Sequence, residues 1–154
     1  NARAGSGSNM KSEIHAAMGL CNLPRVPEVI AQRKEQFLRY HELLADEGLT
    51  LPTPPVENFR HNYAYCPVIF PSESAAIAVL NRLGEEGIRA RRYFFPSLNR
   101  LPYLEGASSC PVAEDIAVRV LCLPMSMDVT PAIQKRIAAL IHGAVAQPAL
   151  VAGL

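Results

Sequence analysis

Short apolar runs rich in β-forming residues alternate with amphipathic helical stretches along the second half of the chain. The runs occupy residues 63–70 (YAYCPVIF), 88–94 (IRARRYF) and 120–123 (VLCL). Strands that alternate with helices are typical of a small sheet covered by helices. The pattern therefore predicts an α/β or α+β fold. Pro67 lies inside the first run, and because proline cannot donate to a β-ladder, we expect an edge strand or a bulge there.

Capping residues mark the helices of this half. Ser72 is a predicted N-cap and Gly87 a predicted stop, Pro111 opens a short helix over 111–119, and Thr130 precedes the first-turn residue Pro131. An irregular proline-rich stretch separates the second strand from the short helix. The apolar residues expected to be buried in the first and last of these helices are Ile77, Leu80, Leu83, Ile133, Ile137, Leu140 and Ile141.

Two more helices are predicted before the first strand. Ser12 is the expected N-cap of the first, which Pro24 ends or bends, and the second runs from near Pro27 to Gly48. Arg33 interrupts the apolar stripe of the second helix, which we expect to pack across a sheet or a partner. The apolar faces comprise Ile14, Ala17, Met18 and Cys21 in the first helix, and Val26, Ile30, Phe37, Tyr40 and Leu44 in the second.

The chain of 154 residues suits one domain with a real core. We expect a flexible entry turn over residues 1–11, the domain over 12–143 and a mobile tail over 144–154, where charge and periodicity are missing. The net charge of +1 makes a nucleic-acid partner a poor expectation. No apolar run approaches the roughly 20 residues of a membrane span, and the start does not resemble a signal peptide.

The four cysteines, Cys21, Cys66, Cys110 and Cys122, are too far apart in sequence for a metal knuckle. We expect buried, reduced thiols in a cytoplasmic protein and no metal site.

Three segments, in this order, carry a resemblance to a known family. They are residues 11–23 (KSEIHAAMGLCNL), 87–104 (GIRARRYFFPSLNRLPYL) and 110–125 (CPVAEDIAVRVLCLPM). Together they resemble the C-terminal small domain of the DegT/StrS family of pyridoxal-phosphate-dependent nucleotide-sugar aminotransferases, which share the fold-type-I architecture. The match covers nearly the whole chain before its tail.

The resemblance implies an enzyme that moves an amino group, usually from glutamate, onto a nucleotide-linked keto-sugar. It implies pyridoxal phosphate as cofactor, a homodimer, and an entry turn that reaches the partner subunit. Two alternatives remain: a non-catalytic dimerisation or regulatory module with the same fold, and an unrelated α/β binding protein. The sugar, the nucleotide and the position and stereochemistry of amination are left open.

No catalytic residue is expected within this chain. Its only lysines are Lys11, Lys34 and Lys135, and none has the surroundings of the family's Schiff-base lysine, which the resemblance places upstream. Lys34 and Lys135 are expected on solvated helix faces. Lys11, beside a helix start, is a candidate contact for an anion such as the cofactor phosphate.

An asparagine of the entry turn is implied as the contact to the cofactor phosphate. Asn9 is slightly favoured, although it precedes Ser12 by one residue fewer than in the family's pattern. Alternatively, Asn1 is the counterpart, and residues 5–11 are then inserted or replaced sequence. Either asparagine also fits a simple turn in a polar linker.

Substrate contacts are implied at Arg91, Tyr93 and Asn99. The arginine fork matches diphosphate oxygens, the tyrosine can stack or hydrogen-bond, and Asn99 stands where many members have histidine, so that it offers polar contact without proton transfer. The simpler alternative for Arg91 and the arginines beside it is a solvated strand face. Glu114 is expected to complement the dipole of its helix.

Overall fold

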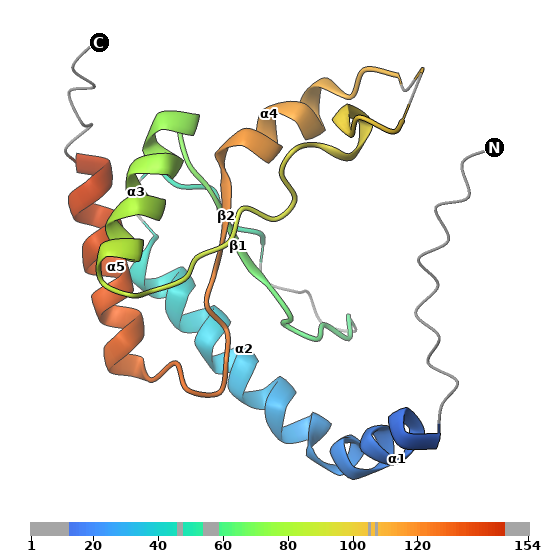
Figure 1. Cartoon of the computed structure of the whole chain (residues 1–154). Helices are drawn as coiled ribbons and strands as arrows, with labels where there is room; N and C mark the ends of the chain where they lie inside the picture. The colour runs from blue at the N-terminus through green and yellow to red at the C-terminus, as the bar shows by residue number, and fades with distance from the viewer. Residues whose placement is uncertain (1–12, 46–47, 54–58, 105, 107, 147–154) are drawn as a thin grey trace.

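A two-stranded antiparallel sheet forms the centre of the computed structural model, which describes residues 13–45, 48–53, 59–104, 106 and 108–146. Strand β1 (Cys66–Ile69) pairs with β2 (Val120–Leu123) so that Cys66 lies opposite Leu123 (Figure 1). Single β-bridges extend both edges of the sheet, one from Thr50 to Ile69 and one from Arg91 to Cys122.

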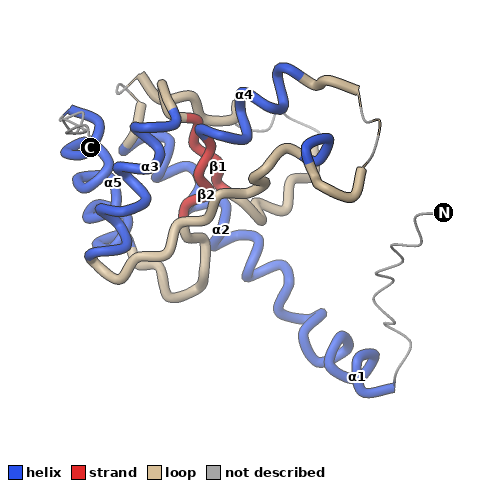
Figure 2. Tube along the Cα trace, turned by 45° about the horizontal axis from the view of Figure 1, so that its top comes forward, coloured by secondary structure: helices blue, strands red, loops and turns tan. Residues whose placement is uncertain are grey.

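Three helices cover one face of this sheet, as Figures 1 and 2 show from two directions. They are α2 (Val26–Leu43), α3 (Glu73–Glu85) and α5 (Pro131–Ala146). Their apolar side chains meet alternate residues of the strands in one continuous core. Its largest fully buried apolar members are Tyr40, Phe37, Phe70, Leu44, Leu83, Leu121, Ile137 and Ile141. The predicted class, a small sheet covered by helices, is confirmed.

Local capping explains where the helices begin. The Ser72 hydroxyl accepts from the Ala75 amide at the start of α3, and the Thr130 hydroxyl accepts from the Ile133 amide in the first turn of α5. Helix α4 (Pro111–Arg119) has the predicted bounds and begins with proline at a position that needs no amide donor. These predictions depended on sequence neighbours alone.

Helix α1 (Glu13–Asn22) forms as predicted and continues through a short 3-10 turn (Leu23–Arg25) into α2. Its apolar residues are not covered by the described part of the chain, with Ile14 73% and Met18 58% exposed. Figures 1 and 2 show α1 projecting away from the sheet and its helices. The apolar face predicted for this helix is therefore free of contact with the core.

Several predicted details are wrong. Residues 88–94 do not form a strand, because only Arg91 meets β2 and the chain then turns back, with the Tyr93 amide bonded to the Arg91 carbonyl. Ile77 and Ile133 are 39% and 37% exposed, because the core-facing sides of α3 and α5 fall one position away, at Ala76 and Gln134.

The ends of other predicted segments also differ. Strand β1 begins at Cys66 instead of residue 63, and Val26 is 41% exposed. Helix α5 continues to Ala146, so the expected tail cannot begin at Ala144; residues 147–154 lie outside the described part. Two of the thiols expected to be buried, Cys21 and Cys110, are exposed, although all four cysteines are free.

Candidate functional site

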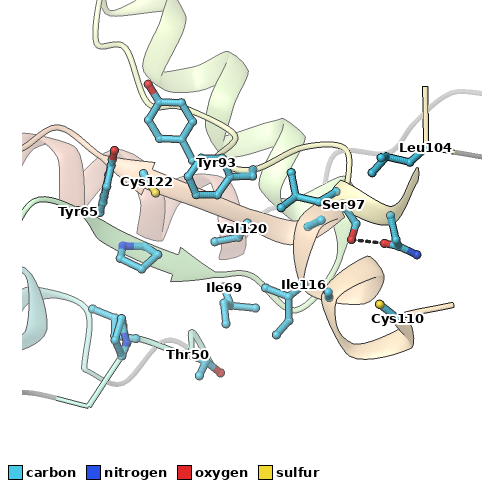
Figure 3. A pocket seen from close by; sticks show the side chains of 18 residues that line it. Thr50, Tyr65, Ile69, Tyr93, Ser97, Leu104, Cys110, Ile116, Val120 and Cys122 are labelled. Atoms are coloured by element: carbon cyan, nitrogen blue, oxygen red, sulfur yellow. Dashed lines mark hydrogen bonds between the residues drawn. The ribbon is translucent and has the colours of Figure 1, made fainter. Parts of the chain in front are cut away.

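Two hollows adjoin each other and share the lining residues Tyr65, Tyr93 and Cys122. The first, which we call the apolar hollow, has a volume of about 820 Å³ and lies on the sheet face opposite the core (Figure 3). Its floor includes Ile69 of β1 and Val120 of β2. Because strand side chains alternate between faces, these residues point away from the core helices and line the hollow instead.

The second hollow, which we call the arginine hollow, has a volume of about 750 Å³. Arg33 of α2 lines it from one side, and Arg89 and Arg91 line it from the extended segment after α3. The segment between β2 and α5 completes it and contributes Asp128. The two hollows thus differ in chemistry, since one is apolar and the other is rich in cations.

Arg91 and Tyr93, both predicted to contact substrate, lie together at the boundary between the hollows. The Arg91 guanidinium donates to the Tyr93 hydroxyl and its carbon lies 5.5 Å from the centroid of that ring. The backbone of Arg91 is held by two hydrogen bonds to Cys122, of 3.1 and 2.8 Å. The Tyr65 ring meets Tyr93 edge-on, with centroids 5.7 Å apart. Arg91, Tyr93 and Tyr65 together offer one cation and two aromatic rings at the boundary between the hollows.

The adjacent Arg92 has a different role. Its guanidinium donates to the Glu73 carboxylate and the Val118 carbonyl, both at 2.8 Å, and stacks 3.7 Å from the centroid of Phe95. Its side chain is only 20% exposed. Arg92 therefore ties the loop after residue 91 to α3 and α4, and it is not the solvated strand-face charge of the simpler alternative.

Asn99 lies in the loop that walls the apolar hollow. Its amide nitrogen donates to the Glu114 carboxylate at 2.6 Å and to the Ser108 carbonyl at 3.1 Å, and its oxygen accepts from the Ser97 hydroxyl (dashed line in Figure 3). Both amide hydrogens are therefore used within the chain. Asn99 can therefore offer a ligand only a further hydrogen bond accepted by its side-chain oxygen.

Glu114 is the centre of this loop network. Its carboxylate also accepts from the Cys110 amide at 2.9 Å and from Arg100 at 2.6 Å. The hydrogen bond from Cys110, followed by those from Arg100 and Asn99, lowers the pKa of Glu114 to about 2. Beyond complementing the dipole of α4, Glu114 fastens the loop to the helix.

The predicted cofactor contacts Asn1, Asn9 and Lys11 lie outside the described residues. Lys34 and Lys135 are exposed on α2 and α5, as expected, and neither lines the two hollows. Pyridoxal phosphate requires a lysine at its carbonyl carbon. The described residues do not by themselves fit this group, because they bring no lysine to either hollow.

Residues 13–45, 48–53, 59–104, 106 and 108–146 contain no group of three or more side chains suited to hold a metal ion, and no helix long and apolar enough to cross a membrane.

Sequence reasoning missed Arg33 and Tyr65 as lining residues. Arg33 could have been found, because its charge interrupts the apolar stripe of α2 and so marks a position that is not part of the core. Tyr65 gave none, since it lay inside a run interpreted as a strand.

The chain is similar to known sugar aminotransferases. The model of the DegT/DnrJ/EryC1/StrS aminotransferase family matches residues 1–142. A dTDP-4-amino-4,6-dideoxy-D-glucose transaminase of Escherichia coli is 32% identical over an alignment of 143 residues that covers 86% of this chain and 38% of that protein. A dTDP-4-dehydro-2,3,6-trideoxy-D-glucose 4-aminotransferase of Saccharopolyspora spinosa is 32% identical over an alignment of 116 residues that covers 74% of this chain and 29% of that protein.

Solved structures share the fold. The aminotransferase TlmJ from Streptoalloteichus hindustanus superposes with a TM-score of 0.78 at 25% identity, over 86% of this chain and 36% of that one. DesI, crystallised in the presence of its TDP-sugar product, gives a TM-score of 0.78 at 29% identity, over 86% of this chain and 35% of DesI. The chain thus spans between 29% and 38% of the length of these four relatives.

Proposed function

The chain belongs to the DegT/DnrJ/EryC1/StrS aminotransferase family, and from this premise we propose that it is the C-terminal part of a pyridoxal-phosphate-dependent enzyme. The enzyme transfers an amino group, from glutamate, to a nucleotide-linked keto-sugar. Relatives named as dTDP-sugar transaminases support this substrate class.

The observation that carries the proposal is the pairing of Arg91 with Tyr93 between the two hollows. A guanidinium fork binds phosphate oxygens with two parallel hydrogen bonds, and a tyrosine ring offers a surface for a sugar or a base. Anchoring of Arg91 to β2 fixes both groups on the sheet. A ligand held there is oriented by rigid elements, which favours reaction geometry.

The chain's own contribution is to bind and orient the substrate. The cofactor, when bound, supplies the electron sink for amino transfer. We place its lysine in a part of the protein N-terminal to this chain, with Asn9 or Asn1, and Lys11, near its phosphate. We further propose a cytoplasmic homodimer in which the entry turn reaches the partner subunit.

A second candidate is a non-catalytic dimerisation or regulatory module with the same fold. The lack of a lysine at either described hollow would favour it only if this chain were the complete protein. The two candidates differ in whether substrate turnover depends on Arg91.

An isotope-transfer assay tests the proposal. The protein that carries this chain is incubated with glutamate labelled at its amino nitrogen and with a dTDP-linked 4-keto-sugar. Mass spectrometry then measures the mass of the sugar nucleotide. We expect the label in the sugar, and less of it with Arg91→Gln. A protein that binds pyridoxal phosphate but leaves every keto-sugar nucleotide unlabelled contradicts the proposal and favours the non-catalytic module.

A further inference from the structure

The three arginines of the arginine hollow come from two separate elements of the fold. In the segment after α3, Ile88 and Ala90 pack against the core, and Ile88 also borders the hollow beside the alternate residues Arg89 and Arg91. Both are exposed, and both line the hollow. The third arginine, Arg33, comes from α2, distant in sequence.

The opposite wall is fastened to α2 around Arg33. Gln32 donates to the Met127 carbonyl at 2.9 Å, and Gln36 donates to the carbonyls of Ser126 and Val129 at 2.9 Å each. The segment from Pro124 to Val129 therefore cannot move away without breaking these three hydrogen bonds, of which the one to Val129 is buried. The hollow is built from elements that are held together independently of its arginines.

The charges in the hollow are not balanced within the described residues. No described carboxylate lies within ion-pair distance of Arg33, Arg89 or Arg91, and Asp128 is the one acidic residue among three arginines in the lining. By contrast, Arg82, Arg92, Arg100, Arg119 and Arg136 each pair with a carboxylate. Arginine stays protonated at any working pH, so a bound anion would offset the mutual repulsion of these three side chains.

We propose that the arginine hollow binds the diphosphate of the nucleotide-linked substrate, with Arg33 and Arg89 acting beside Arg91; this rests on the proposed function. Three guanidinium forks reaching one hollow from two elements suit two linked phosphates better than one. A volume of about 750 Å³ falls within the size of small-molecule sites. The Tyr65–Tyr93 pair at the rim offers ring surfaces to the rest of the ligand.

Calorimetric titration of the protein that carries this chain tests the site. The probes are inorganic pyrophosphate, uridine diphosphate and, to represent a single phosphate such as that of the cofactor, inorganic phosphate. We expect both diphosphates to bind more tightly than phosphate. Arg33→Gln and Arg89→Gln should each weaken pyrophosphate binding roughly tenfold or more, the usual loss for a charge-assisted contact.

Lys34→Gln is the matched control. Lys34 follows Arg33 on α2, is exposed and does not line the hollow, and its replacement removes the same charge. Neither Arg33 nor Arg89 makes a hydrogen bond to a described residue, so the variants should keep the thermal midpoint of the wild type. Unchanged pyrophosphate affinity in the folded Arg33→Gln and Arg89→Gln variants overturns the site. Equal weakening by Lys34→Gln, or phosphate binding as tight as pyrophosphate, overturns it as well.

Failure of the site and failure of the proposed function give different results. Arginine-dependent pyrophosphate binding without amino transfer would support the proposed diphosphate site and contradict the proposed function. Amino transfer whose KM for the sugar nucleotide is unaffected by Arg33→Gln and Arg89→Gln would support the proposed function and contradict the diphosphate site.

Discussion

Arg91 and Arg92 are adjacent in sequence, yet their surroundings assign them different tasks. Arg92 is mostly buried against Phe95 and bonded to α3 and α4. Arg91 is exposed, and among the described residues its side chain bonds only to the Tyr93 hydroxyl. The sequence alone did not distinguish them, because the distinction depends on what each guanidinium meets after the chain turns at Tyr93.

Exchanging each arginine for glutamine should separate binding from stability. Arg91→Gln should raise the KM for the sugar nucleotide roughly tenfold, because a charge-assisted contact is lost, and leave the thermal midpoint unchanged. Arg92→Gln should lower the free energy of unfolding by about 1–3 kcal/mol, since the Val118 carbonyl and the Glu73 carboxylate lose their donor. Steady-state kinetics and thermal denaturation provide the two readouts. A loss of stability in Arg91→Gln together with a raised KM in Arg92→Gln would contradict these two assignments.

Glu114 should make the loop around Asn99 sensitive to acid. Its pKa in the folded chain, about 2, lies below the ordinary value of 4.5. The stabilisation is therefore complete above the ordinary pKa and is lost as the pH falls from 4.5 toward 2. Hydrogen exchange of residues 97–104 should rise over that pH range, and Glu114→Gln should raise it already at neutral pH.

Asp115→Asn is the control for this prediction. Asp115 is the next residue of α4, and its carboxylate pairs with Arg119 instead of the loop. If both variants loosen the loop equally, the effect belongs to the helix and not to the Glu114 contacts.

At the level of elements, two buried glutamines join α2 to α5 and to the wall of the arginine hollow. Gln134 of α5 donates to the Gln36 carbonyl at 2.8 Å and accepts from Arg39 at 2.9 Å. Gln36 in turn holds the carbonyls of Ser126 and Val129. We expect these polar contacts to set the register between α2 and α5.

Gln134→Leu should cost about 1–3 kcal/mol of unfolding free energy, because buried groups on α2 lose their partners while the side-chain volume is nearly kept. Gln32→Leu, which removes an exposed contact to Met127 in the same wall, should change it by less than about 0.5 kcal/mol. Urea denaturation measures both. A neutral Gln134→Leu variant would mean that apolar packing sets the register.

The helices were largely predictable and the sheet edges were not. Ser72, Pro111 and Thr130 signal helix starts through contacts within one turn, so the sequence suffices. In place of the strand expected over 88–94, there is a single bridge from Arg91 to Cys122. Its extent depends on pairing with β2, about thirty residues further along the chain, which the local sequence does not encode. The burial of Gln134 in place of Ile133 likewise depends on α2.

For the whole molecule, the resemblance located part of the site and topology supplied the rest. Arg91 and Tyr93 were predicted and lie together, while Arg33 joins them only because α2 packs against the segment between β2 and α5 that lines the same hollow. Helix α1 remains apolar and exposed within the described residues. The described residues therefore form the proposed substrate-binding wall and bring no lysine to its two hollows.

We propose that this chain provides the substrate side of an active site whose cofactor lysine lies elsewhere in the protein. Visible absorbance after addition of pyridoxal phosphate tests it most directly. We expect no band of lysine-bound cofactor from this chain by itself, and a band once the polypeptide is extended N-terminally to the length of its relatives. A band from this chain that disappears in Lys11→Ala, Lys34→Ala or Lys135→Ala would contradict the account.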